Sequence, residues 1–130
     1  MVVPYDVLNP ACPTRQVIAQ VGQKWSALVL CALESGGALR FSQLRRVLSD
    51  VSQKSLTQTL RQLERDGFVE RTVRPTVPIT VEYRLTALGR ELSDVVVAIR
   101  AFAYANMPRI EAARADYDAR VGAAEPVPTP

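Results

Sequence analysis

A polar segment near the middle of the chain, residues 52–66, holds side chains that can bind both phosphates and base edges. Leu56, Leu60 and Leu63 recur at the spacing of a helix that packs on one side. Its opposite face shows Gln53, Lys54, Thr57, Gln58, Arg61 and Arg65. Glutamine, lysine and arginine form paired or forked hydrogen bonds to bases, and threonine offers a methyl group to thymine. The pattern predicts a DNA-recognition helix, and an ordinary solvated face is the alternative interpretation.

Local signals mark both ends of this recognition helix. Ser52 stands where an N-cap belongs, so its hydroxyl is expected to accept a bond from a free backbone N–H. Val51 and Leu56 have the spacing of a hydrophobic staple, and Gly67 suits the left-handed residue after a helix. The N-terminal end also carries partial positive charge, which favours a nearby phosphate.

Positive charge is concentrated around the recognition helix. Residues 40–74 hold eight basic and four acidic side chains, whereas the rest of the chain holds eight basic and nine acidic ones. Fourteen of the sixteen basic residues are arginine, whose guanidinium group favours forked contacts. The net charge of the whole chain, +3, is modest, but its local concentration is typical of a nucleic-acid binder.

The residue types argue against an enzyme or a metalloprotein. Histidine is absent, so the commonest general base and the commonest metal ligand are missing. Cys12 and Cys31 make neither a disulfide framework nor a zinc site, and no glycine-rich phosphate loop is present. We expect no catalytic residue, no cofactor and no metal. Because the sequence shows neither a membrane span nor a signal peptide, we also expect a cytoplasmic protein without a membrane partner.

The remaining pattern predicts the elements that position the recognition helix. The 130 residues suit one domain, and the hydrophobic periodicity predicts a mainly α (α+β) fold. Cys12 and Pro13 open a first helix, with Pro13 at its first position, and Gly22 ends it. A second apolar helix begins near Lys24 and ends at Gly36.

A third short helix is expected just before the recognition helix. Residues 39–41 predict a brief edge strand, and Ser42 is expected to cap a helix through about Leu48. Leu44, Val47 and Leu48 are expected to face inward. Two short helices joined by a tight turn form a helix-turn-helix.

Alternating segments after Gly67 predict a β-hairpin. Residues 68–73 and 80–85 both alternate, and the proline-containing connection 74–79 is too long for a two-residue turn. A hairpin of this kind is a wing, whose tip is expected to place Arg74 against a DNA backbone or in a minor groove. An ordinary surface hairpin is the alternative.

The C-terminal third predicts a long helix capped by Thr86. Its apolar stripe consists of Leu88, Leu92, Val95, Val96, Ile99, Phe102 and Ala103. Val97 and Ala98 widen this stripe, which favours burial against a second subunit over deeper burial in its own core. Pro108 is expected to interrupt the helix, with a shorter polar helix over 110–117.

These elements divide the chain into three parts. We expect an N-terminal arm over residues 1–10 and a mobile tail over residues 123–130. Between them, residues 11–122 form a single winged helix-turn-helix domain that includes extra N- and C-terminal dimerisation helices. Its DNA-reading core spans residues 38–85.

In this order of elements, residues 11–103 resemble the HxlR-type winged helix-turn-helix transcriptional regulators of bacteria, within the MarR-like superfamily. The motifs that carry the resemblance are Cys12-Pro13, Gly22-Gln23-Lys24-Trp25, Arg40-Phe41-Ser42-Gln43-Leu44-Arg45, Ser52-Gln53-Lys54-Ser55-Leu56-Thr57, the segment 60–67, Val77-Pro78, Val81-Glu82-Tyr83 and Leu85-Thr86-Ala87-Leu88-Gly89. The resemblance implies a homodimeric repressor that binds a palindromic operator in double-stranded DNA. It also implies dimerisation through the N-terminal and C-terminal helices.

The resemblance also makes Cys12 a candidate redox sensor, because some relatives sense electrophiles or oxidants through a cysteine at this position. A thiol just before a helix N-terminus can have a lowered pKa, and Arg15 lies one turn on. An unreactive thiol at a capping position is the alternative. Cys31 lies in an apolar helix and is interpreted as a buried hydrophobic residue.

We therefore expect a sequence-specific DNA-binding transcriptional regulator, responsive to a thiol reagent, an electrophile or a small-molecule effector. A winged-helix protein-interaction module without DNA binding is the alternative. The residues expected to contact DNA are Arg40, Ser42, Gln53, Lys54, Ser55, Thr57, Gln58, Arg61 and Arg74. Arg65 is less favoured, since it sits near the far end of the recognition helix.

Overall fold

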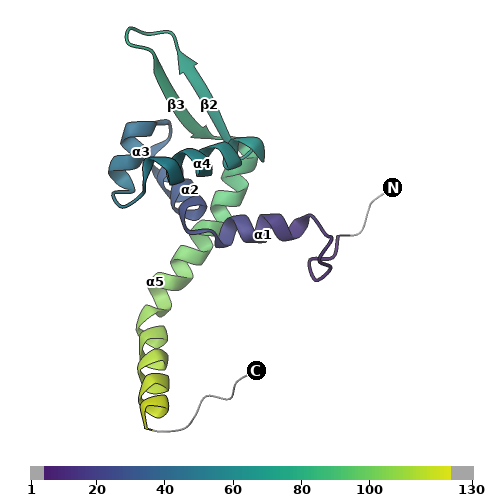
Figure 1. The fold of residues 1–130 in the computed structure, drawn as a ribbon, viewed down its shortest axis with the longest axis vertical. Coiled ribbons are helices and arrows are strands. Elements are labelled where there is room, and N and C mark those ends of the chain that lie inside the picture. Colours follow the sequence, from purple (N-terminus) through teal and green to yellow (C-terminus); the bar gives the residue numbers. More distant parts are fainter. Residues whose placement is uncertain (1–4, 124–130) are drawn as a thin grey trace. The chain divides into compact units, whose positions relative to one another are not determined.

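The chain is mainly helical with one small sheet, as the sequence predicts (Figure 1). A computed structural model describes residues 5–123. The chain divides into two compact units, Met1–Val97 and Ala98–Pro130. The expected arm 1–10 and tail 123–130 lie partly outside the described residues, and residues 5–10 form irregular turns. None of the helices in the described part has both the length and the apolar character needed to span a bilayer.

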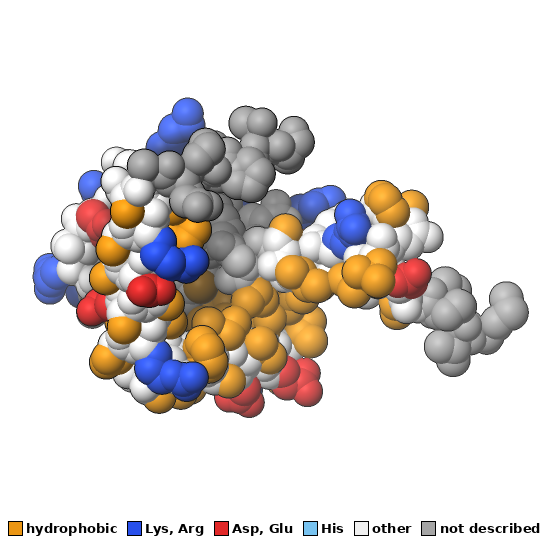
Figure 2. Space-filling view, turned by 90° about the horizontal axis from the view of Figure 1, so that it is seen from below, with side chains coloured by type: hydrophobic (Ala, Val, Ile, Leu, Met, Phe, Trp, Pro, Cys, Tyr) orange, Lys and Arg blue, Asp and Glu red, His pale blue; other side chains and the backbone are white. Residues whose placement is uncertain are grey.

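The first two helices pack side by side at the N-terminal end. Helix α1 spans Thr14–Gly22 and α2 spans Lys24–Gly36. Pro13 precedes α1 as its N-cap, one position earlier in the helix than predicted. No residue of α1 is buried. Figure 2 shows hydrophobic side chains along the projection that contains this helix. Helix α2, by contrast, buries five of its thirteen residues.

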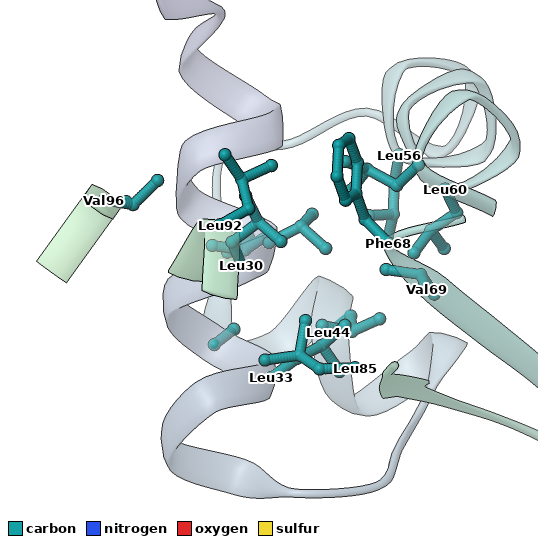
Figure 3. Packing of buried hydrophobic residues seen from close by; sticks show 14 of the residues in the cluster. Leu30, Leu33, Leu44, Leu56, Leu60, Phe68, Val69, Leu85, Leu92 and Val96 are labelled. Carbon is teal, nitrogen blue, oxygen red and sulfur yellow. The ribbon is translucent and has the colours of Figure 1, made fainter. Parts of the chain in front are cut away.

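The core joins α2 to the helix-turn-helix and to the base of the wing. Its buried members include Val29, Leu30, Leu33, Leu44, Leu56, Leu60, Leu63, Phe68, Val69, Leu85, Leu92 and Val96. Figure 3 shows labelled members of this core, among them Leu30, Phe68 and Leu92, extending from separate elements. Burial of each leucine contributes about 1.5–3 kcal/mol, so the recognition helix is fixed to the rest of the fold by its apolar face.

Helix α3, Phe41–Val47, begins two residues earlier than a cap at Ser42 would place it. Arg40 is its N-cap, because the Arg40 backbone N–H donates to Oε1 of Gln43 at 2.8 Å. The prediction that Ser42 caps this helix is therefore wrong, since Ser42 lies inside its first turn. Val47 was expected to face inward, but it is 61% exposed, because Leu44 and Leu48, four residues apart, occupy the buried face. Leu44 and Leu48 are buried as predicted.

Helix α4, Gln53–Arg65, is the predicted recognition helix, and both of its caps are confirmed. The Ser55 backbone N–H donates to the Ser52 hydroxyl at 3.0 Å. At the other end, the Phe68 N–H donates to the Leu63 carbonyl at 2.9 Å. Gly67 completes a Schellman motif with φ +83°, a left-handed conformation that residues with a side chain rarely adopt. The direction of α4 is thus set by hydrogen bonds at its two ends.

Replacing Ser52 by alanine is expected to lower the free energy of unfolding by about 1 kcal/mol, because the Ser55 N–H loses its acceptor. Urea denaturation followed by circular dichroism measures the change. Ser49→Ala, at an exposed position just before the turn, is the matched control and should change stability little. Equal losses in the two variants would contradict a capping role for Ser52.

The three strands form an antiparallel sheet in the order β1-β3-β2. Strand β1 is Leu39–Arg40, β2 is Val69–Arg74 and β3 is Thr80–Leu85. Figure 1 shows β2 and β3 as the predicted two-stranded wing. Residues 75–79 connect them, and the register pairs the first residue of β2 with the last of β3.

Helix α5, Ala87–Gly122, is continuous, so the predicted break at Pro108 is wrong. The residues expected to form a separate helix over 110–117 belong to α5. A proline removes one intrahelical bond, whereas the alanines before it and the arginine, glutamate and alanines after it favour the helix strongly. The predicted Thr86 cap is confirmed, because its hydroxyl accepts the Gly89 N–H at 2.9 Å.

Thr86 also joins α5 to the turn that ends α4. Its hydroxyl donates to the Gly67 carbonyl at 2.6 Å, and its backbone N–H donates to the Phe68 carbonyl at 3.1 Å. Gly89 lies directly against the Phe68 backbone, where a Cβ atom would overlap the carbonyl oxygen. The absence of a side chain at residue 89 therefore allows α5 to approach this turn.

Candidate nucleic-acid interface

The exposed face of α4 carries the polar residues that the sequence singled out. Leu56, Leu60 and Leu63 are buried, and Thr59 joins them on the inner face. Gln53, Lys54, Gln58 and Arg61 are exposed, whereas Ser55 and Thr57 are half-buried. The separation of apolar and polar residues thus leaves amides and cations free to contact a ligand.

A groove separates α4 from the wing and gathers part of this polar face. This wing groove has a volume of about 490 Å³. Its polar lining consists of Gln53, Thr57, Arg61, Glu64 and Arg71, and its apolar lining of Phe41, Leu60 and Tyr83. Three of the predicted residues therefore share one hollow. The apolar residues form part of the core surface, so the polar groups above them stand on a rigid support.

Arg71 of β2 is a member of the wing groove that the sequence prediction missed. It faces Tyr83 of β3 in the register of the hairpin. Neither Arg71 nor Arg61 takes part in any ion pair between described residues. The alternation of β2 already placed this arginine between Val69 and Val73 on one face of the strand. A cation between two valines was the available sequence signal, whereas its place beside α4 depends on the hairpin register.

Two other predicted residues of α4, Ser55 and Gln58, lie on its opposite flank. Ser55 and Gln58 line a second hollow of about 240 Å³ between α4 and the first two helices. We call it the amide pocket, and its remaining residues are Gln20, Gln23, Trp25, Thr59 and Gln62. Lys54 lines neither hollow. The predicted set therefore divides between two flanks of one helix rather than forming a single cluster.

Arg40, Ser42 and Arg74 lie outside both hollows. Arg40 and Ser42 are exposed at the start of α3. Arg74 ends β2, and its Nε lies 3.0 Å from Oε1 of Glu82. This ion pair holds the guanidinium group along the wing and offsets part of its charge. The wing tip beyond it, residues 75–79, contains no charged residue and exposes Val77 and Ile79.

Cys12 sits in a turn just before α1 and receives several hydrogen bonds. Its Sγ lies 2.9 Å from the Thr14 hydroxyl and accepts the Asp6 N–H at 3.3 Å. The Thr14 hydroxyl, helped by the backbone N–H groups of Thr14 and Asp6, lowers the pKa of this thiol despite some desolvation. Arg15 does not act on the thiol as the sequence suggested. Its guanidinium group donates to the Val7 and Leu8 carbonyls.

The lowered pKa of Cys12 predicts a pH profile of alkylation. In a Cys31→Ser background, the thiolate should form at a lower pH than in an ordinary cysteine, so the rate with iodoacetamide rises early along the pH scale. Thr14→Val removes the hydroxyl donor and should move the midpoint to higher pH. An unchanged midpoint would mean that this hydroxyl does not stabilise the thiolate.

A capped recognition helix after a short helix, followed by a two-stranded wing, defines a winged helix-turn-helix protein. The model of the HxlR-like helix-turn-helix family matches residues 20–111. The chain belongs to this family, so the predicted family is confirmed.

Individual relatives agree with this assignment. The chain is 45% identical over 103 residues to the uncharacterized HTH-type transcriptional regulator YtfH of Escherichia coli K12, covering 79% of this chain and 81% of that protein. The structure of the ytfH regulator of Salmonella typhimurium matches with a TM-score of 0.78 and 42% identity, over 85% of this chain and 98% of that one. The reduced form of the redox regulator HypR matches with a TM-score of 0.71 and 34% identity, over 77% and 98% of the two chains. The chain is thus a helix-turn-helix transcriptional regulator, and its family consists of regulators rather than enzymes.

Proposed function

We propose that this regulator is a homodimeric repressor that binds a palindromic site in double-stranded DNA, in the cytoplasm. The wing groove is the observation that carries the proposal. It combines Arg61 and Arg71, which form no ion pair with any residue in the range 5–123, with the base-binding side chains Gln53 and Thr57. Acidic side chains in the same region are half as numerous as basic ones, so the local field favours a polyanion.

The geometry supports base contacts from α4 and backbone contacts from the wing. The N-terminal turns of α4 enter the major groove, where Gln53, Thr57 and Arg61 contact base edges. Arg71, on the wing side of the groove, contacts the phosphate backbone. The ion-paired Arg74 contributes less charge, and the apolar wing tip packs against sugars rather than pairing with phosphates.

Gel shift at a series of salt concentrations tests DNA binding. The probe is the DNA that flanks the protein's own gene, and its affinity should fall steeply with salt because phosphate contacts release counterions. Arg71→Ala should reduce the logarithmic salt slope by about one. Affinity that is flat with salt would sink the proposal and favour a winged-helix protein-interaction module.

The proposal of a homodimer is supported by apolar side chains that are exposed in the described part of the chain. Helix α1 exposes Val17 and Ile18, and the Ala98–Pro130 unit exposes Phe102 and Tyr104. Apolar side chains at this density on helices are typical of subunit contacts. Light scattering after size-exclusion chromatography should give the mass of a dimer, and Ile18→Glu should shift it to the monomer. A wild-type monomer at every concentration would rule out the dimer.

Thiol regulation is proposed for Cys12 on two grounds. Its pKa is lowered by hydrogen bonds, and the similar protein HypR is named a redox regulator. Oxidation of this thiol should weaken DNA binding in the gel shift. If Cys12→Ser leaves oxidant-induced release unchanged, Cys12 is not the sensor.

A further inference from the structure

A second large hollow lies within the Met1–Val97 unit and shares no residue with the wing groove. This α5 pocket has a volume of about 600 Å³. It lies between the end of α2, the loop that follows, the end of β3 and the first two turns of α5. Its size is within the range of pockets that bind small organic molecules.

A buried hydroxyl that lacks a partner among the described residues belongs to a residue in the wall of this pocket. Ser93 of α5 is 1% exposed, and its Oγ has no hydrogen-bond partner among the described residues. A buried polar group left unpaired is costly, and few occur in a folded chain. Because Ser93 lines the pocket, a ligand seated there can supply the missing bond.

The pocket wall carries charges of both signs that are not paired with one another. Arg84 and Arg90 provide guanidinium groups, and Glu34 and Asp94 provide carboxylates. None of these four takes part in an ion pair between described residues. Arg90 is partly oriented, since its Nη1 donates to the Leu85 carbonyl at 3.5 Å. Leu33 and Leu85 supply apolar surface between the charges.

We propose that the α5 pocket binds a small amphoteric molecule, an organic acid that also carries an amine. The guanidinium groups of Arg84 and Arg90 bind its carboxylate, since arginine recognises carboxylates through forked bonds. The carboxylates of Glu34 and Asp94 bind its ammonium group, and Ser93 Oγ completes the polar contacts. The apolar part of the ligand packs on Leu33 and Leu85.

Such a ligand bridges the base of the wing and α5. Arg84 belongs to β3, whereas Arg90 and Asp94 belong to α5, so occupancy links the two elements. Any effect of the ligand on DNA affinity rests on the proposed function. Binding itself does not, and it is therefore measured on the full chain without DNA.

The test uses the standard L-amino acids as probes. Each is compared with its deaminated acid and its decarboxylated amine, by thermal unfolding and by isothermal titration calorimetry. At least one amino acid should raise the unfolding temperature and bind more tightly than both of its counterparts. Equal binding of the acid alone, or binding by no member of the panel, would overturn the proposal.

Two variants separate binding from folding. Ser93→Ala should unfold at the same temperature as wild type or higher, because an unsatisfied hydroxyl is removed, yet bind the amino acid more weakly. Arg90→Gln should weaken binding at least about tenfold through loss of a charge-assisted bond. Arg109→Gln, exposed and outside the pocket, is the matched control. Unchanged affinity in both pocket variants would exclude this site.

Discussion

Replacing Arg61 by alanine is expected to lower affinity for the operator by about tenfold to a hundredfold. The side chain is exposed on α4, lines the wing groove and has no ion-pair partner among the described residues, so its guanidinium group is free to bind a guanine edge. The loss should be concentrated on one base position, because a forked contact discriminates between bases. Competition gel shifts with operators altered one base pair at a time measure it.

Two further variants serve as comparisons for Arg61→Ala. Arg114→Ala removes an exposed cation from α5, far along the chain from the helix-turn-helix, and should leave affinity close to wild type. Arg71→Ala should weaken operator and random DNA alike, as expected of a phosphate contact. Equal losses for Arg61→Ala and Arg114→Ala would place the DNA-binding surface elsewhere.

Replacing Gly89 by alanine is expected to lower the free energy of unfolding by about 3 kcal/mol. The new Cβ atom would overlap the Phe68 carbonyl oxygen. That carbonyl accepts the Thr86 N–H at 3.1 Å, so the backbone cannot move away without breaking the bond. Alanine's higher helix propensity returns only about 1 kcal/mol. Urea denaturation monitored by circular dichroism gives the difference.

Gly22→Ala is the matched control for this substitution. Gly22 ends α1, and a Cβ atom there would have no heavy atom within 4 Å. Alanine in a helix is favoured over glycine, so this variant should be stabilised by up to about 1 kcal/mol. Comparable destabilisation of the two variants would mean that contact with Phe68 is not the reason glycine is needed at residue 89.

Short-range signals predicted the recognition helix and the wing well. The caps of α4 depend on Ser52 and Gly67, which act on backbone groups within a few residues and are therefore visible in the sequence. The alternation of β2 and β3 likewise identified the hairpin, although only Val69 and Leu85, paired at its base, are buried. The family motifs placed these elements in the correct order.

The start of α3, the continuity of α5 and the role of Arg71 were not predicted correctly, because they depend on competing local hydrogen bonds and on tertiary contacts. Ser42 has the residue type of a cap, but the Gln43 side chain binds the Arg40 N–H and moves the helix start. Pro108 was expected to end a helix whose neighbouring residues in fact continue it. Arg71 became a site residue only when the hairpin register set it opposite Tyr83, beside α4. Pairings across elements cannot be obtained from one stretch of sequence.

The bonds of Thr86 have a mechanical consequence. A single residue separates the end of β3 from the start of α5, and its hydroxyl receives the Gly89 N–H while it donates to the Gly67 carbonyl. The last turn of α4 and the first turn of α5 are therefore clasped together, without a slack linker between them. A rotation of the first turns of α5 therefore acts on the end of the recognition helix through the hydrogen bonds of Thr86. This one side chain limits how far the two helices can rotate relative to each other.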